Sequence, residues 1–351
     1  MKSRLLFIAC IVAILACEEP PVKMLTTSQN SQTESLLQAI SILDAQNVWV
    51  SGHKGTYAHT SDGGTTWVSS VMPNADTLQF RDLHAFSNEE VVLMSAGPGK
   101  LSQIRKTTNG GQNWEVTYLM EDSTGFLNTI EFWDDRRGLA FGDAINGSLF
   151  ILKTDDGGNS WSRVDPDKLP PALGSEGGFA ASGTCIATGR DGKAWIGTGA
   201  GDRPRVLYTQ DYGDTWQSIS TPIVSGEAAG IASINFWDDQ NGFVAGGDLA
   251  ITDQYTRNVA FTINGGTIWS LAEHPIMKGA IYGTGLVTFR EMPHVFVSGP
   301  KGINYSDDYG TSWDSLSTDN YWAIDFVTDS DDKAVGWATG TDGKILQILL
   351  K

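Results

Sequence analysis

The sequence predicts an all-β fold, namely a seven-bladed β-propeller whose blades are four-stranded antiparallel sheets. The first observation is a phrase of eight residues, Ser/Thr-x-Asp/Asn-x-Gly-x-x-Trp, that occurs six times along the chain. Its closing tryptophans are 47, 47, 55, 53 and 44 residues apart, and repeats of this length are typical of propeller blades. The second observation is a pair of short apolar segments around a turn, which occurs seven times and indicates short strands at regular spacing.

Each phrase is expected to form the hairpin between the third and fourth strands of a blade. Its acidic or amide side chain can accept hydrogen bonds from backbone N–H groups of the turn, and a following glycine tolerates positive φ. The closing tryptophan begins the next strand and can lay its apolar ring against the blade. We therefore interpret the phrases as structural, rather than as calcium or sugar sites. The positions concerned are Asp62, Asn109, Asp156, Asp211, Asn264 and Asp308, with Trp67, Trp114, Trp161, Trp216, Trp269 and Trp313.

The seventh blade lacks one strand in the C-terminal part of the sequence. Its last apolar segment, residues 344–350, ends where the phrase and the fourth strand follow in the other blades. Residues 22–26 are expected to supply that strand, because a ring closed in this way leaves no long unpaired edge. No linker or change in composition divides the repeats, so residues 35–351 are predicted to form one domain.

The N-terminal segment predicts export and a lipid anchor. Lys2 and Arg4 precede an apolar run that is too short to span a membrane comfortably, which is typical of a signal peptide. Residues 1–16 are interpreted as a lipoprotein signal peptide because Ile-Leu-Ala-Cys17 resembles the bacterial lipobox. Cys17 would then carry the lipid, and residues 17–34 would hold a spacer and the closing strand. Glu18 favours the outer membrane over retention at the inner membrane; an ordinary signal peptide with an incidental cysteine is the alternative.

Charge and cysteine content exclude several classes of protein. The chain has 24 Lys+Arg and 41 Asp+Glu, a net charge of −17, so nucleic acid is not expected as a partner. Once the signal is removed and Cys17 is lipidated, only Cys185 remains, and no internal disulfide can form. Cys185 lies in an apolar strand and is expected to be a buried small hydrophobic residue. No zinc spacing or dinucleotide fingerprint occurs, so neither a metal nor a cofactor is predicted.

The repeated phrase resembles the Asp-box, or BNR repeat, of sialidases, other propeller glycosidases, sortilin-type receptors and the photosystem II stability/assembly factor group. Stretches outside the boxes resemble the bacterial exported relatives of the photosystem II stability/assembly factor; they are residues 80–84, 129–138, 169–173, 176–185 and 246–248. This resemblance covers nearly all of residues 35–348. It implies a scaffolding or binding role, and no catalytic residue is predicted.

A glycan-directed hydrolase of the sialidase type is the alternative function. Sialidases use an arginine triad whose first member lies near the start of blade one, but here no arginine occurs between Arg4 and Arg81. Paired carboxylates for other sugar chemistry stay open, because their separation is spatial. We therefore favour a monomeric, non-catalytic module that binds an envelope protein or complex and is held to the membrane by its lipid, with a glycan as the alternative ligand.

The working surface is predicted on the face opposite the boxes, where the chain enters the inner strands. Residues at these entries from different blades should converge on the channel mouth; they are Arg81, Asp82, Asn128, Glu176, Ser182, Ser233, Tyr282 and Trp322. The loops between second and third strands would add His53, Asp143, Asp248, Arg203, Arg205 and Arg257. Arginines and aromatic residues together have the composition of binding hot spots. In the alternative interpretation, Arg81 and Asp82 form a local salt bridge and Glu176 only satisfies backbone donors of its loop.

Overall fold

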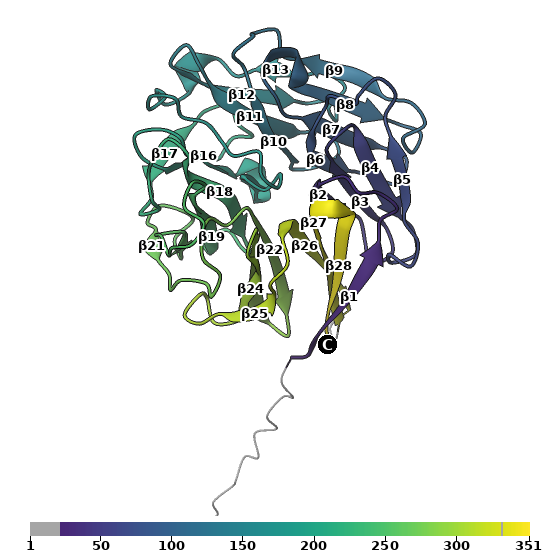
Figure 1. Cartoon of the computed structure of the whole chain (residues 1–351). Helices are drawn as coiled ribbons and strands as arrows, with labels where there is room; N and C mark the ends of the chain where they lie inside the picture. The colour runs from purple at the N-terminus through teal and green to yellow at the C-terminus, as the bar shows by residue number, and fades with distance from the viewer. Residues whose placement is uncertain (1–21, 331–332) are drawn as a thin grey trace, which may run out of the picture.

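The computed structural model describes residues 22–330 and 333–351, and these form a seven-bladed propeller. Seven four-stranded antiparallel sheets stand around a central channel, and each runs outward from an inner strand (Figure 1). The predicted fold class is therefore confirmed. The predicted signal peptide, residues 1–16, and the predicted lipidation site, Cys17, lie outside the described residues. No helix of the described part is long and apolar enough to cross a membrane.

The strands are listed here from the inner to the outer edge of each blade. Blades 1 to 3 contain β2 (Leu37–Ile42), β3 (Val48–Gly52), β4 (Thr56–Thr60) and β5 (Val68–Val71); β6 (Phe80–Ala85), β7 (Val91–Ser95), β8 (Gln103–Thr107) and β9 (Glu115–Leu119); and β10 (Leu127–Phe132), β11 (Gly138–Ile145), β12 (Ser148–Thr154) and β13 (Ser162–Arg163). Blade 4 contains β14 (Ile186–Thr188), β15 (Ala194–Gly197), β16 (Arg205–Thr209) and β17 (Gln217–Ser220).

The remaining blades follow the same order until the last one. Blades 5 and 6 contain β18 (Ala229–Phe236), β19 (Gly242–Asp248), β20 (Val259–Thr262) and β21 (Ser270–Leu271); and β22 (Gly283–Phe289), β23 (Met292–Gly299), β24 (Gly302–Ser306) and β25 (Asp314–Ser317). Blade 7 contains β26 (Tyr321–Ser330), β27 (Lys333–Gly340), β28 (Lys344–Leu350) and β1 (Met24–Asn30). Short 3₁₀ turns lie at η1 (Gly99–Leu101), η2 (Pro166–Lys168), η3 (Arg190–Gly192) and η4 (Thr341–Gly343).

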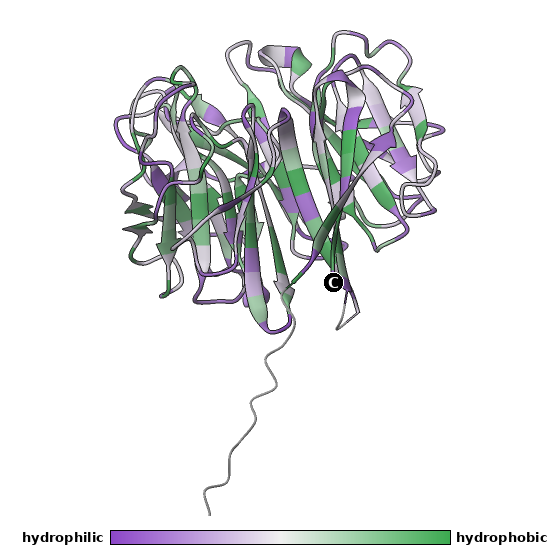
Figure 2. Cartoon of the chain, turned by 60° about the horizontal axis from the view of Figure 1, so that its bottom comes forward, coloured by the Kyte–Doolittle hydropathy of each residue, from purple (hydrophilic) through white to green (hydrophobic). Residues whose placement is uncertain are grey.

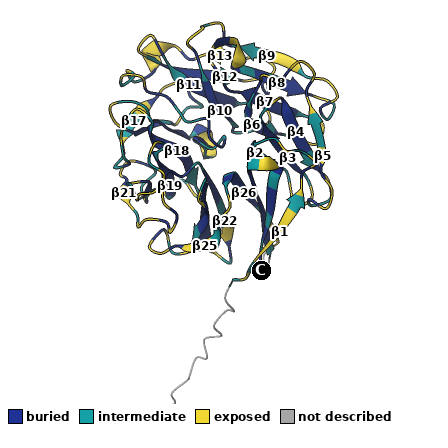
Figure 3. Cartoon of the chain, viewed as in Figure 1, coloured by how far each residue is buried: buried dark blue, intermediate teal, exposed yellow. Residues whose placement is uncertain are grey.

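The core lies between neighbouring blades rather than within one sheet. The second strands β3, β7 and β15 are buried along their whole length, because both faces of each blade are covered by a neighbour. A strand covered on both faces has a continuous apolar sequence, and apolar positions follow the strands in Figure 2. Trp49, Trp195 and Trp337, which lie on the second strands of blades 1, 4 and 7, are fully buried. The outermost strands β13 and β21 are exposed (Figure 3).

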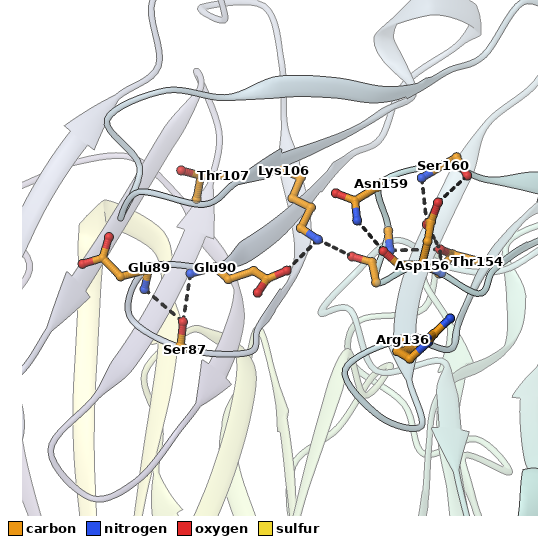
Figure 4. A network of polar contacts seen from close by, with 12 residues as sticks. Ser87, Glu89, Glu90, Lys106, Thr107, Arg136, Thr154, Asp156, Asn159 and Ser160 are labelled. Carbon is orange, nitrogen blue, oxygen red and sulfur yellow. Dashed lines mark hydrogen bonds and ion pairs between the residues drawn. The ribbon is translucent and has the colours of Figure 1, made fainter.

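The Asp-box hairpins join the third and fourth strands, as predicted. In blade 3 the Asp156 Oδ1 atom accepts hydrogen bonds from Thr154 Oγ1 at 2.8 Å and Ser160 N at 2.9 Å (Figure 4). Thr154 Oγ1 in turn accepts the Gly158 N–H at 2.9 Å. Lys106 of blade 2 reaches this turn, because its Nζ lies 2.6 Å from Glu90 Oε1 and donates to the Gly157 carbonyl at 2.8 Å. The box is therefore a self-satisfied turn that also holds two blades together.

The N-terminal strand closes the ring, but with different bounds from those predicted. We expected residues 22–26, whereas β1 spans Met24–Asn30 and pairs antiparallel with all of β28. The strand is longer because every residue of β28 has a backbone pairing partner in it. Gln29 adds side-chain contacts, since its Oε1 accepts hydrogen bonds from Trp67 Nε1 at 2.9 Å and Trp337 Nε1 at 3.1 Å. One side chain of β1 therefore links blade 7 to the box tryptophan of blade 1.

Candidate functional site

The two ends of the channel differ in character. We call the end that carries the Asp-boxes the box face; the turns between first and second strands lie there too, since Gly63 N donates to Gln46 O at 3.0 Å. The opposite end, the mouth face, carries the entries to the inner strands and the loops between second and third strands. The predicted binding residues all come from segments of the mouth face.

One loop of blade 4 crosses the channel at the mouth face. Residues 177–183, which we call the central loop, precede β14 and form hydrogen bonds with other blades. Gln38 Nε2 donates to Ala181 O at 3.3 Å, and Arg81 Nη1 donates to Ala180 O at 3.2 Å. Ser182 Oγ donates to Tyr282 O at 2.7 Å on the far side. The loop is therefore anchored to blades 1, 2 and 6, and it divides the channel into an outer and an inner cavity.

The outer cavity, which we call the mouth cavity, has a volume of about 350 Å³. Its lining residues come from blades 2 to 7, and those of blade 4 include the central loop. Its aromatic lining comes from Phe126, Phe179, Tyr282 and Trp322, and its polar lining from Arg81, Asn128 and Asp143. The Tyr282 and Trp322 rings meet edge to face, with centroids 4.7 Å apart. This volume falls within the range of about 300–1,000 Å³ for ligand pockets.

Burial shifts the pKa values of the ionisable groups in and beside this cavity. Arg81 Nε donates to Gln79 Oε1 at 2.9 Å, and burial lowers the pKa of its guanidinium. Burial also raises the pKa of Asp143, whose Oδ1 accepts a hydrogen bond from Asn128 Nδ2 at 2.8 Å. Nearby, burial and then the charge of Arg81 lower the pKa of His53 to about 4, so its ring is neutral at neutral pH. Arg81 is therefore held in place by neutral acceptors rather than by a carboxylate.

The predicted residues do not all line one cavity. Arg81, Asn128, Tyr282 and Trp322 line the mouth cavity together. Asp82 and Ser182 line the inner cavity below the central loop instead. Ser233 is fully buried and bonds Thr184 Oγ1 and Thr284 Oγ1, so it faces neither cavity as a free ligand-binding group.

Glu176 is not a binding residue at the mouth, which corrects the prediction. Its side chain is fully buried and forms a two-pronged ion pair with Arg205, with Nε–Oε1 and Nη2–Oε2 distances of 2.7 Å. Glu176 Oε2 also accepts the Leu173 N–H at 3.0 Å. Arg205 was expected in the loop between the second and third strands, but it begins β16 and is itself buried. The pair needs each partner's charge, so neither side chain is available to a ligand.

The predicted alternative for Asp82 is also wrong. Arg81 and Asp82 form no salt bridge, because adjacent residues on a strand point to opposite sides. Asp82 is buried and accepts hydrogen bonds from Leu83 N at 2.8 Å, Ile130 N at 2.6 Å and Thr129 Oγ1 at 2.8 Å. It therefore ties the inner strands β6 and β10 together.

The inner cavity, which we call the channel cavity, has a volume of about 240 Å³ and was not predicted. Polar residues of five inner strands line it at equivalent positions, namely Ser41, His84, Glu131, Asn235 and Asp325. Burial, then the charge of Glu131, raises the pKa of Asp325 to about 7. The signal was available in the sequence as a polar residue between two apolar residues near the end of each of these apolar segments, as in Ile130-Glu131-Phe132 and Ile324-Asp325-Phe326. In the described residues, no group of three or more His, Cys, Asp or Glu could hold a metal ion.

The fold defines the class of protein as a seven-bladed β-propeller, in which six blades carry the hairpin phrase Ser/Thr-x-Asp/Asn-x-Gly-x-x-Trp. No family model matches the chain. The Photosystem II assembly lipoprotein Ycf48 of Picosynechococcus sp. is 26% identical over 216 residues, which cover 48% of this chain and 59% of that protein. The chain is thus similar in sequence to a photosystem II assembly factor over about half its length.

Solved structures show the same fold. A structure of Ycf48 bound to D1 peptide has a TM-score of 0.63 at 18% identity, covering 94% of this chain and 97% of that one. Ycf48 from Cyanidioschyzon merolae has a TM-score of 0.64 at 19% identity, covering 92% and 98%. The WD40 propeller domain of Doa1 has a TM-score of 0.56 at 11% identity, covering 93% and 97%.

Proposed function

We propose that this chain is a non-catalytic protein-binding module, similar in task to an assembly factor, that takes a segment of a partner protein at the mouth cavity. The observation that carries the proposal is the convergence of Arg81, Tyr282 and Trp322 from three different blades on one cavity. Arginine and aromatic residues dominate protein-binding hot spots. The similarity to Ycf48, and a Ycf48 structure described as bound to D1 peptide, support the same kind of task.

The cavity is also preorganised for binding. The Arg81 guanidinium is fixed by the Gln79 side chain and the Ala180 carbonyl, and the central loop is anchored on several blades. A rigid site loses little side-chain entropy when a ligand binds. The pocket is too small for a folded domain and suits a few residues of an extended segment.

The test is capture of envelope proteins by the purified chain after crosslinking, with variants at the mouth. Arg81→Ala and Trp322→Ala should each weaken capture about 30-fold, equivalent to the roughly 2 kcal/mol of a hot-spot residue. Arg136→Ala is the control, because Arg136 is an exposed arginine of the box face. Undiminished capture by both mouth variants would contradict the proposal, as would turnover of aryl sialosides by the native chain.

We propose further that the chain is exported and anchored by a lipid on Cys17, with the outer membrane as its address. The support is the lipobox-like sequence before Cys17 and glutamate at position 18. The partner would then be a protein or complex of the cell envelope. Cys17→Ala should move the chain from the membrane to the soluble fraction on cell fractionation; persistent membrane association of this variant would count against anchoring.

A further inference from the structure

The N-terminal strand enters the propeller at the box face. β28 follows η4 at the mouth face and runs toward the box face, and Met24 of β1 pairs with Leu350 at its end. One residue further out, Lys23 N donates to Lys351 O at 2.8 Å. The first residues that the structure describes therefore lie at the box-face end of blade 7, where β1 begins beside the end of β28 (Figure 1).

The lipid proposed on Cys17 would hold this end of the propeller close to a membrane. Cys17 precedes Val22, the first described residue, by five positions. A fully extended chain spans at most about 3.6 Å per residue, so these five steps cover at most about 18 Å. The mouth face lies at the other end of the strands. The proposed anchor, on which this inference rests, therefore favours an orientation with the box face toward the bilayer.

Exposed apolar side chains gather on the same face. In the box-face turns of the part of the chain that the structure describes, the exposed large apolar side chains all belong to blades 5 and 6; they are Ile263, Ile268, Met292 and Tyr309. We call these four residues the box-face patch. Ile263 and Ile268 are 80% and 65% exposed, and the Tyr309 ring is half exposed beside Trp237. Blade 6 packs against blade 7, so the patch lies near the start of β1.

The two isoleucines have no role in the turn that carries them. The blade 5 box differs from the blade 1 box at three positions, where Ile263, Asn264 and Ile268 replace Ser61, Asp62 and Thr66. Thr66 Oγ1 donates to Asp62 Oδ2 at 2.7 Å, whereas Ile268 contributes its backbone N–H, which donates to Asn264 Oδ1 at 2.9 Å. Each of the three replacements makes the surface less polar, and the hairpin of blade 1 forms without them.

The charges around the patch favour a lipid surface without net charge. The box-face turns of blades 5 and 6 carry an excess of acidic side chains, namely Asp238, Asp239, Glu291, Asp307 and Asp308 against Arg290. An anionic membrane surface would repel this excess. Zwitterionic phospholipids carry no net charge, and an apolar patch can bury its side chains at the boundary between their head groups and acyl chains.

We propose that the propeller rests with its box face on a zwitterionic phospholipid surface, and that the box-face patch enters the interfacial region. Ile263, Ile268 and Met292 supply apolar area. Tyrosine is enriched at membrane–water interfaces because its ring is apolar and its hydroxyl is polar, which suits Tyr309. The mouth cavity then opens away from the membrane, so the partner segment would come from the aqueous side.

The experiment measures how close labelled positions of the lipidated chain lie to lipid on vesicles of phosphatidylcholine and phosphatidylethanolamine. Ile263→Cys places a fluorophore in the patch. Thr108→Cys is the matched control, because Thr108 is exposed at the same position of the blade 2 box, and blades 2 and 5 are both two blades from blade 7. Val71→Cys places the fluorophore at the mouth-face end of β5, where Val71 is 61% exposed. The label is selective, because Cys185 is buried and the lipid occupies Cys17 in the anchored chain.

Nitroxide-bearing lipids should quench the Ile263→Cys label strongly, the Thr108→Cys label less and the Val71→Cys label hardly at all. Added phosphatidylglycerol should reduce quenching of the Ile263→Cys label. A vesicle-bound chain in which the three labels are quenched equally would overturn this proposal alone, whereas a lipidated chain that does not float with the vesicles would contradict the anchor as well. Emission that depends on protein concentration and not on lipid would instead show a second copy on the patch. Stronger quenching on anionic vesicles would contradict the assigned lipid class.

A second comparison removes the isoleucines without disturbing the hairpin. The double variant Ile263→Ser, Ile268→Thr carries the side chains that blade 1 has at the equivalent positions, so its box should fold as the blade 1 box does. With the fluorophore on Met292→Cys, quenching by nitroxide-bearing lipids should fall clearly in the double variant. Unchanged quenching would show that the two isoleucines do not make the contact and would overturn the assigned patch.

Discussion

At the scale of single residues, a charged side chain near the mouth has either a structural or a binding role according to its partners. Arg81 lies among neutral acceptors and remains on the cavity wall, whereas Glu176 and Arg205 satisfy each other in the interior. Both arginines follow from the sequence as candidates for the same surface. The distinction between them depends on a contact between residues 29 apart in the chain, which no local pattern encodes.

The Glu176–Arg205 ion pair predicts a large loss of stability on neutralising one partner. Glu176→Gln keeps the shape of the side chain but leaves the Arg205 charge uncompensated in the interior, so the free energy of unfolding should fall by about 3–5 kcal/mol. Urea unfolding followed by tryptophan fluorescence measures this. Asp214→Asn is the control, because it breaks an exposed pair with Lys153 and should cost at most about 1 kcal/mol. Similar losses in both variants would refute the assigned role.

At the scale of elements, β1 closes the ring of blades as well as forming the outer edge of blade 7. It completes the sheet of blade 7 over its full length, and Gln29 extends the contact to the first blade. The acceptor it provides satisfies two indole N–H groups that belong to different blades. The strand therefore joins the N-terminal and C-terminal parts of the chain, and it also connects blade 7 to blade 1.

Removing this acceptor should weaken ring closure. Gln29→Ala leaves the Trp67 and Trp337 N–H groups without their partner, and a buried donor left unsatisfied costs about 1–3 kcal/mol. We expect a lower melting temperature in calorimetry. Thr27→Ala in the same strand is the control, because Thr27 is exposed and its replacement should change stability by less than about 0.5 kcal/mol. If both variants melted at the same temperature, the Gln29 side chain would not contribute to ring closure.

At the scale of the whole molecule, the ring places carboxyl groups from separate blades around one channel cavity. Asp82, Glu131 and Asp325 line it, and burial raises the pKa values of Asp82 and Asp325. Such groups bind a proton more tightly in the folded chain than in the unfolded one. Asp62 has the opposite behaviour at the surface, since hydrogen bonds from Thr66, first its N–H and then its hydroxyl, lower the pKa. The raised pKa values of Asp82 and Asp325 and the lowered pKa of Asp62 therefore affect the stability of the fold in different pH ranges.

Asp325 should make the protein less stable as the pH rises. Its carboxyl has a pKa of about 7 when folded, against an ordinary 3.8; between these values the folded state holds a proton that the unfolded state has lost. Its contribution to stability is therefore present below about pH 4 and is lost by about pH 7. Asp325→Asn should flatten the decline in unfolding free energy between pH 4 and 7, as measured by denaturant titrations at several pH values. An unchanged slope in this variant would show that Asp325 titrates normally.

The sequence by itself determined the blade repeat, the box turns and the source of the closing strand. A box is held by hydrogen bonds between residues two and four positions apart, as between Asp156 and Thr154 or Ser160, so its chemistry is written in consecutive residues. The site is different. Arg81 and Ala180 are 99 residues apart, and Gln38 and Ala181 are 143 apart. Only the closed ring brings these residues together and lets the central loop divide the channel. The tertiary structure therefore decided which predicted residues share the mouth cavity, because that choice rests on contacts between blades.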